Sequence, residues 1–241
     1  RTRTEIPTEA NSCPPTRAYD PETPPPGERF SADSRSGGPK NGLEHPHFDT
    51  MANVGAFDGS ATAPETSLPV TPVEQLLASA DDLVARIRLN FGLDREGFDR
   101  DVLPLLHRYA SYVHLLPATA ANCFSAPGGL LRLGLEVAFF SLQGTDAHIF
   151  GGGSTITTRR LLEPRWRLAT FVGGLCGELH RAINDVVVTD PAGEPWPAYL
   201  LPLADWLADH QAEHYELRWQ PDAARSRAAG LFALPHVVPP A

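Results

Sequence analysis

Four side chains of reactive or metal-binding type fall within one short segment, residues 176–185. Cys176 and His180 are four residues apart, so on a helix they would share one face. Their sulfur and nitrogen atoms are donors that zinc accepts. Glu178 would point elsewhere on the same helix, and Asp185 follows in the next turns. The plain alternative is a buried thiol beside a helix-end histidine, and spacing alone leaves both open.

A second stretch, residues 115–140, holds a loop of small residues that turns on Pro127-Gly128-Gly129 and leads into an apolar helix. The helix is apolar nearly all round, which favours a central, buried position. Loops that enter such helices often carry chemistry. This loop offers Asn122, Cys123 and Phe124, with neither a carboxylate nor a histidine.

A basic cluster, Arg159, Arg160, Arg165 and Arg167, lies shortly after the run Gly151-Gly152-Gly153. The glycine run does not form a phosphate-binding loop, because no Gly-Lys-Ser/Thr follows and no strand precedes it. The arginines are our candidates for DNA contact, and the alternative is a solvated basic end of a helix.

Composition narrows the classes of function. The net charge of −9 argues against a broad basic nucleic-acid surface but permits a local patch. Three cysteines do not make a disulfide framework, so we expect free thiols in a reducing, cytoplasmic environment. We find neither a membrane span nor a secretion signal, because no apolar run approaches the required length.

Periodicity predicts a mainly α domain. Apolar residues recur at helical spacing over about 72–90, 94–117, 130–142, 164–183, 200–210 and 222–234. A helix start with a capping box is predicted at Thr71, Pro72 and Glu74. Gly92 is predicted to end that helix, and Asp94 is predicted to cap the next one. Residues 186–197 predict a short hairpin or extended excursion, and HYELRW at 214–219 alternates as a strand does. Paired glycines at 173–174, with Gly177, suggest close approach of two helices.

Residues 1–70 predict a disordered, proline-rich tail, because they hold 11 of the 24 prolines and few large apolar side chains. Residues 71–241 form the expected folded domain. The single methionine, Met51, leaves two interpretations of residues 1–50 open: a genuine tail, or untranslated sequence upstream of the true start.

Several segments, in this order, resemble the HD-type domain of MobH-class conjugative relaxases, the TraI-like proteins of integrative conjugative elements and plasmids. They are the stretches LLPATAANCFSAPGGLLRLGLEVA, LATFVGGLCGELHRAIND, VTDPAGEPWPAYLLPLADW and HYELRW. The resemblance spans about residues 72–235. It implies an HD-like helical bundle that takes part in DNA processing at the start of conjugative transfer.

The departures from this family fall on its metal-binding residues. Three consecutive histidines of the family correspond to Asn122, Cys123 and Phe124, and a further histidine corresponds to Leu133. The paired His-Asp corresponds to Gly177-Glu178, while Asp185 is retained. Since a metal at such a site needs converging imidazoles and carboxylates, most of the donors are gone.

We therefore expect a catalytically degenerate, DNA-transfer-associated or scaffold protein that binds DNA or conjugation-machinery proteins. One alternative is a residual metal-dependent phosphohydrolase or nuclease in which Glu178 and Asp185 are catalytic; another is a protein-interaction module. We expect no cofactor, although a divalent metal stays possible: with the family's geometry, Cys123, Cys176, His180 and Asp185 would face one another as weak candidate ligands. The same geometry would allow Cys123 and His180 to act as a nucleophile and base. Oligomeric state is not predicted.

Overall fold

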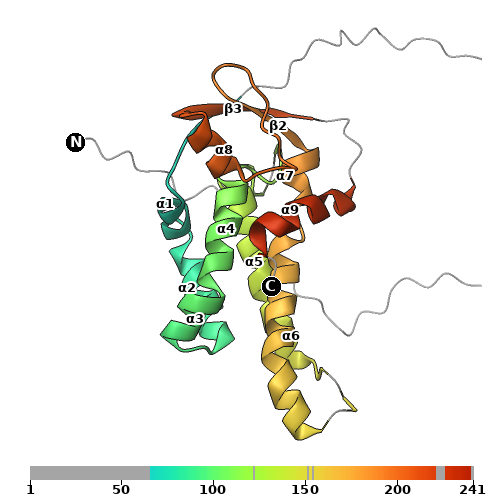
Figure 1. Ribbon diagram of the computed structural model, residues 1–241. Coiled ribbons are helices and arrows are strands. Elements are labelled where there is room, and N and C mark those ends of the chain that lie inside the picture. The colour runs from blue at the N-terminus through green and yellow to red at the C-terminus, as the bar shows by residue number, and fades with distance from the viewer. Residues whose placement is uncertain (1–65, 122, 151, 154, 221–225, 240–241) are drawn as a thin grey trace, which may run out of the picture. The chain divides into compact units, whose positions relative to one another are not determined.

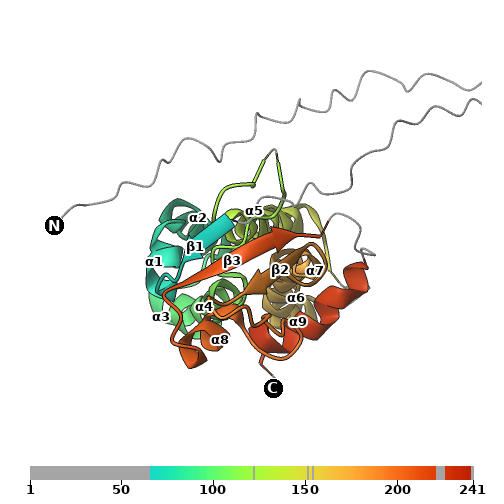
Figure 2. The same cartoon turned by 90° about the horizontal axis from the view of Figure 1, so that it is seen from above.

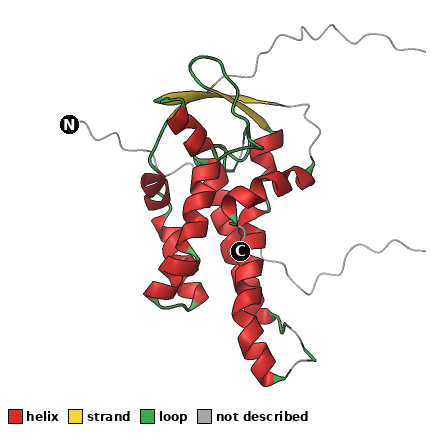
Figure 3. Cartoon of the chain, in the orientation of Figure 1, coloured by secondary structure: helices red, strands yellow, loops and turns green. Residues whose placement is uncertain are grey.

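The computed structural model describes residues 66–239 except 122, 151, 154 and 221–225. This part of the chain is mainly helical with a small antiparallel sheet, as the sequence predicts (Figure 1, Figure 3). The elements are β1 (Thr66–Pro69), α1 (Val73–Ala78), α2 (Asp81–Phe91), α3 (Arg95–Asp101), α4 (Leu103–Val113), α5 (Gly129–Gly144), the 3-10 helix η2 (Thr145–Ala147), α6 (Ile156–Cys176), α7 (His180–Asn184), β2 (Val186–Thr189), α8 (Leu203–Asp209), β3 (His214–Trp219), the 3-10 helix η3 (Arg227–Ala229) and α9 (Gly230–Val237).

The sheet has the order β1-β3-β2, with β3 in the middle. It lies across one end of the helices (Figure 2). Tyr215 and Leu217 of β3 are buried while their neighbours are exposed, which confirms the predicted alternation. Leu68 of β1 pairs with Tyr215, and Val188 of β2 pairs with Leu217. One apolar face of the sheet thereby joins the helical core.

β1 is a strand that the sequence pattern does not reveal. It lies within residues 66–69, at the end of the stretch for which we expect a tail, and it forms because β3 offers an edge and Leu68 can be buried. Residues 1–65 lie outside the described residues, so the expectation of a proline-rich tail stays a prediction for them.

The helical core is built around α4 and α5. α5 packs along α6 and against α2, and α4 contacts α1, α3, α8 and α9. The buried apolar residues of α5 include Leu130, Leu131 and Leu135. This placement agrees with the central, buried helix expected from the sequence.

Close approach of α5 and α6 depends on one glycine. A Cβ added at Gly174 would lie 2.9 Å from the Cα of Ala138 and 2.5 Å from Ser141 Oγ, which is too close. A Cβ added at Gly173, the preceding residue, would have nothing within 4 Å. The expectation of close helix contact is therefore confirmed for Gly174 and wrong for Gly173.

Several helix boundaries differ from the sequence-based expectation. The helix predicted over 72–90 breaks after α1, where Ser79 Oγ donates to the Leu76 carbonyl and Ala80 leaves helical backbone angles. The capping box at Thr71 does not form, since no side chain caps α1. Asp94 caps α3 by accepting from the Gly97 N–H at 2.8 Å, and Gly92 ends α2 with a φ of 66°, both as predicted.

α6 begins at Ile156, eight residues before the expected start at 164, because Thr155 accepts a hydrogen bond from the Thr158 N–H and Pro164 is tolerated on an exposed part of the helix. The helix expected to continue to 183 is interrupted at Gly177, after which α7 begins at His180. In the described residues the last helix, α9, starts at Gly230 and follows the 3-10 helix η3, while positions 221–225 of the helix predicted over 222–234 lie outside the described residues.

His114, at the end of α4, is fully buried. Its Nδ1 lies 3.0 Å from the Tyr215 hydroxyl, and its Nε2 lies 3.0 Å from the Thr71 carbonyl oxygen. Burial lowers the pKa of His114, and the hydrogen bond to the Thr71 backbone opposes this shift only in part. The ring therefore joins the end of α4 to β3 and to the entry of α1 in its neutral form.

We expect His114 to make the protein acid-sensitive. Its folded pKa lies below the unfolded value of about 6.5, so its stabilising contribution is complete above pH 6.5 and is lost as the pH falls toward the folded pKa. Urea unfolding between pH 7.5 and 5 should show a falling free energy of unfolding in the wild type and a flatter dependence in His114→Gln. Equal slopes in the two proteins would contradict this assignment.

Candidate functional site

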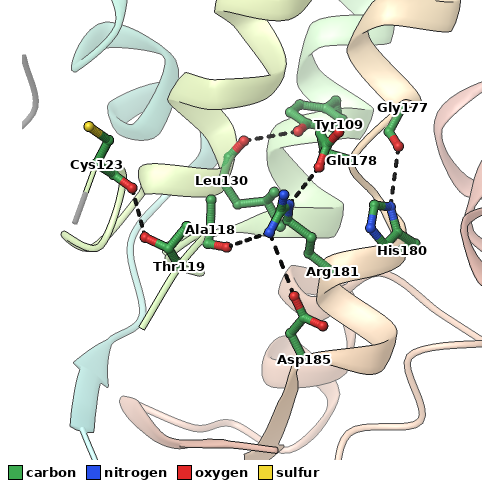
Figure 4. A network of polar contacts seen from close by, with 10 residues as sticks. All are labelled: Tyr109, Ala118, Thr119, Cys123, Leu130, Gly177, Glu178, His180, Arg181 and Asp185. Atoms are coloured by element: carbon green, nitrogen blue, oxygen red, sulfur yellow. Dashed lines mark hydrogen bonds and ion pairs between the residues drawn. The ribbon is translucent and has the colours of Figure 1, made fainter. Parts of the chain in front are cut away.

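The carboxylates singled out in the sequence meet at one arginine (Figure 4). Arg181 of α7 donates from Nε to Glu178 Oε2 at 2.5 Å, and its Nη1 lies 3.7 Å from Asp185 Oδ2. The same Nη1 donates to the Ala118 carbonyl oxygen at 3.2 Å. We call Glu178, Arg181, Asp185 and the Ala118 carbonyl the Arg181 cluster.

Local sequence explains how this cluster forms. Glu178 and Asp185 stand three residues before and four residues after Arg181, spacings that place side chains together on a helix. Ala118 comes from the loop between α4 and α5, which the fold places against α7. The cluster is largely shielded, since the exposed fractions are 27% for the Arg181 side chain, 20% for Glu178 and 4% for Asp185.

The Arg181 cluster does not fit the divalent metal that an HD-type site would hold. A guanidinium is permanently charged and has no acceptor, so it occupies the position of a cation between the two carboxylates and cannot itself bind one. A metal ion would have to displace it to reach the oxygen atoms of Glu178, Asp185 and Ala118. The hydrogen bond drawn from the His180 ring in Figure 4 runs to the Gly177 carbonyl and not to the cluster.

The positions that the sequence resemblance aligns with the histidines of HD-type relaxases make contacts of other kinds. Asn122 lies outside the described residues. Phe124 has a φ of 64°, and its carbonyl accepts from the Ala118 N–H at 2.9 Å. Leu133 packs against the core. Gly177 directs its carbonyl toward His180 Nδ1 at 3.3 Å. These contacts lie within the loop, within the core and within the turn before α7, and the hydrogen bond from Arg181 to the Ala118 carbonyl joins the loop to α7.

The sulfur and imidazole candidates do not converge. Cys123 is not a free thiol, and Figure 4 shows its side chain turned away from Arg181, with His180 on the other side of that arginine. Burial raises the pKa of the Cys176 thiol to about 12, which keeps it protonated and a poor ligand or nucleophile near neutral pH. The structure thus brings together Glu178 and Asp185, but not Cys123 and His180.

A different group of potential ligands does converge in the described residues: Asp190, Glu194 and His210, with one donor atom from each within 4.8 Å of the others. His210 Nδ1 lies 2.8 Å from Asp190 Oδ2, and this hydrogen bond is the main cause of the lowered pKa of Asp190. Asp190 falls within the hairpin or extended excursion predicted over 186–197, and His210 falls at the end of the helix predicted over 200–210. Their separation along the chain carries no ligand spacing, so no sequence signal could have joined them.

The basic cluster lies on the N-terminal half of α6, which extends past the neighbouring helices in Figure 1. Arg160 and Arg165 are exposed, and Arg159 is half-buried. Arg167 instead bridges elements: it pairs with Asp146, donates to Thr145 Oγ1 at 3.0 Å and donates to the Asn90 carbonyl at 2.8 Å. Of the four predicted DNA contacts, Arg167 therefore has a structural role.

Trp166 lies beside these arginines and is 47% exposed. Its ring stacks on Phe150 with an interplanar angle of 6°.

In the described residues, no helix combines the length and the apolar character that crossing a membrane requires.

Comparison with known proteins assigns the chain to a family. No curated protein sequence matches the chain. A family model does match, over residues 68–241, which are nearly all of the described part. The description of that model is "Putative helicase". The match begins within β1 and covers α1 to α9 with the other two strands, so the chain belongs to the TraI_2 family.

Proposed function

We propose that this chain is a TraI-like domain of the HD type that has lost metal-dependent catalysis and works in conjugative DNA transfer by binding. The observation that carries the proposal is the Arg181 guanidinium lying between Glu178 and Asp185. It supplies the positive charge that those carboxylates require, and the protein provides it from its own side chain.

A helicase motor is not part of this proposal, although the family description uses that word. Nucleic-acid motors of the P-loop kind need a lysine in a glycine-rich loop to hold the phosphates of the nucleotide. Residues 68–241 contain no lysine. Binding without nucleotide hydrolysis therefore agrees better with the residues present.

A hydrolysis assay and a metal analysis test the proposed absence of catalysis. The purified full chain should show no metal-stimulated hydrolysis of nucleotides or single-stranded DNA, and Asp185→Asn should leave its metal content unchanged. Turnover that disappears in Glu178→Gln would overturn the proposal and favour a residual phosphohydrolase. Bound metal that disappears in Asp185→Asn would overturn it as well.

The N-terminal half of α6 is the proposed DNA contact. Arg160 and Arg165 are exposed there beside the half-buried Arg159 and the 47% exposed Trp166. In a chain of net charge −9, a local basic surface is where phosphate contacts would concentrate. An arginine side chain and an exposed indole also suit a nucleic-acid strand, because one neutralises phosphate and the other stacks on a base.

Binding of DNA oligomers at several salt concentrations tests this surface. Replacing Arg160 and Arg165 by alanine should weaken binding about tenfold or more. It should also reduce the slope of the logarithm of the binding constant against the logarithm of the salt concentration by about two. The double variant of Arg95 and Arg108, both exposed on other helices, removes the same charge elsewhere and should change binding little. An equal loss of DNA affinity in the two double variants, or binding that is insensitive to salt, would contradict a phosphate-binding role for α6.

A further inference from the structure

We propose that Asp190, Glu194 and His210 form a binding site for one divalent transition metal of the zinc type, separate from the Arg181 cluster. The three residues offer two carboxylates and an imidazole, a donor set that zinc and its neighbours in the first transition row accept. This inference does not depend on the proposed function, since none of these residues takes part in the Arg181 cluster or the α6 surface.

Asp190 is held in place before any ligand arrives. It follows β2 and is only 6% exposed. Its Oδ1 accepts from the Ala192 N–H at 2.9 Å and from the Glu194 N–H at 2.8 Å. Gly193 closes the turn with a φ of 87°, and its N–H donates to the Asp190 carbonyl. These contacts leave Oδ2 directed toward His210.

His210 is fixed by a different element. It is the C-cap residue of α8, and its N–H donates to the Trp206 carbonyl at 3.1 Å. Its ring lies against the Trp206 ring with centroids 4.6 Å apart, and Trp206 is itself buried. The imidazole thus has a supported orientation, while a 24% exposed side chain keeps the site open to ions from solvent.

Glu194 completes the set with little rearrangement. The donor atoms lie within 4.8 Å of one another, whereas donors around a tetrahedral ion bound at about 2.0–2.1 Å are separated by roughly 3.3–3.4 Å. Glu194 is exposed, so a change of rotamer can bring its carboxylate closer. The metal would replace the hydrogen bond between His210 Nδ1 and Asp190 Oδ2, whose 2.8 Å separation would widen to about 3.3–3.4 Å. The proton of the neutral ring would move from Nδ1 to Nε2, and water would fill the fourth position.

The Asp190–His210 hydrogen bond could also be a clamp that only ties the turn to α8. The two roles make different demands on Glu194. A clamp uses the backbone N–H of Glu194, which every side chain preserves, whereas a metal site uses its carboxylate. Glu194→Gln therefore separates the roles without disturbing the turn.

The test uses the full chain, stripped of metal by a chelator and titrated with zinc chloride in a calorimeter near pH 7. We expect one ion per chain, about tenfold or more weaker binding in Glu194→Gln and about hundredfold or more in His210→Gln. Asp185→Asn should bind as the wild type does, which distinguishes this site from the Arg181 cluster. Zinc should also raise the melting temperature of the wild type, and it should raise the melting temperature of Glu194→Gln by less.

Three results would overturn the proposal: no binding to the wild type, binding unchanged in Glu194→Gln, or stoichiometric binding that is lost in Asp185→Asn. If His210→Gln proves too unstable to measure, the comparison of the wild type with Glu194→Gln decides alone, because Glu194 is exposed and its backbone contacts remain.

Discussion

Replacing Arg181 by methionine is expected to lower the free energy of unfolding by about 2–3 kcal/mol. Breaking a buried ion pair costs about 3–5 kcal/mol, and the cost is lower here because Arg181 and Glu178 keep some exposure to water. Glu178 and Asp185 would then repel each other across a shielded space without the guanidinium. The Ala118 carbonyl would lose its donor, which loosens the contact between the loop and α7.

Urea denaturation followed by circular dichroism measures this effect. Arg95→Met is a matched control, because Arg95 pairs with Asp99 at 3.6 Å while its side chain is 84% exposed, and such pairs contribute at most about 1 kcal/mol. Adding Glu178→Gln and Asp185→Asn to the Arg181→Met protein should recover part of the loss by removing the repulsion. A cost no larger than that of Arg95→Met would show that the Arg181 cluster is not a stabilising unit.

Alanine at positions 173 and 174 should have effects of opposite sign. At Gly174 the new Cβ would meet the Ala138 backbone at 2.9 Å, so α5 and α6 would have to separate, at a cost of about 1–3 kcal/mol. At Gly173 the methyl group has open space, and alanine should stabilise the helix by up to about 1 kcal/mol.

Thermal or urea unfolding of the two single variants checks this pair. They share the same helix, the same composition and the same change in helix propensity, so the difference between them isolates the contact with α5. Destabilisation of both variants by the same amount would show that helix spacing at Gly174 does not limit packing.

The sequence predicts those parts of the fold that depend on near neighbours. Alternation in HYELRW predicts β3 because a strand buries every second residue, and Tyr215 and Leu217 are the buried ones. Asp94 and Gly92 predict helix ends because capping and positive φ are local properties. In contrast, β1 is a strand only because β3 lies beside it, so its four residues carry no signal of their own.

The candidate site illustrates the same limit. The spacing of Glu178, Arg181 and Asp185 is visible in the sequence, but spacing alone does not show that the arginine lies between the two carboxylates. Its role depends on where its guanidinium points, and the Ala118 carbonyl that helps hold it comes from a loop 63 residues earlier. Cys123 and His180 are separated by the same packing that forms the cluster.

By itself the sequence determined the helical class, the buried α5 and the strand at 214–219, because residue identity and short-range spacing suffice for these features. Only the tertiary structure decided that Arg181 joins Glu178 to Asp185 and that Asp190 and Glu194 meet His210. The physical reason is that charge pairing and ligand convergence act over a few ångströms in space, and the chain reaches those distances only after its helices pack.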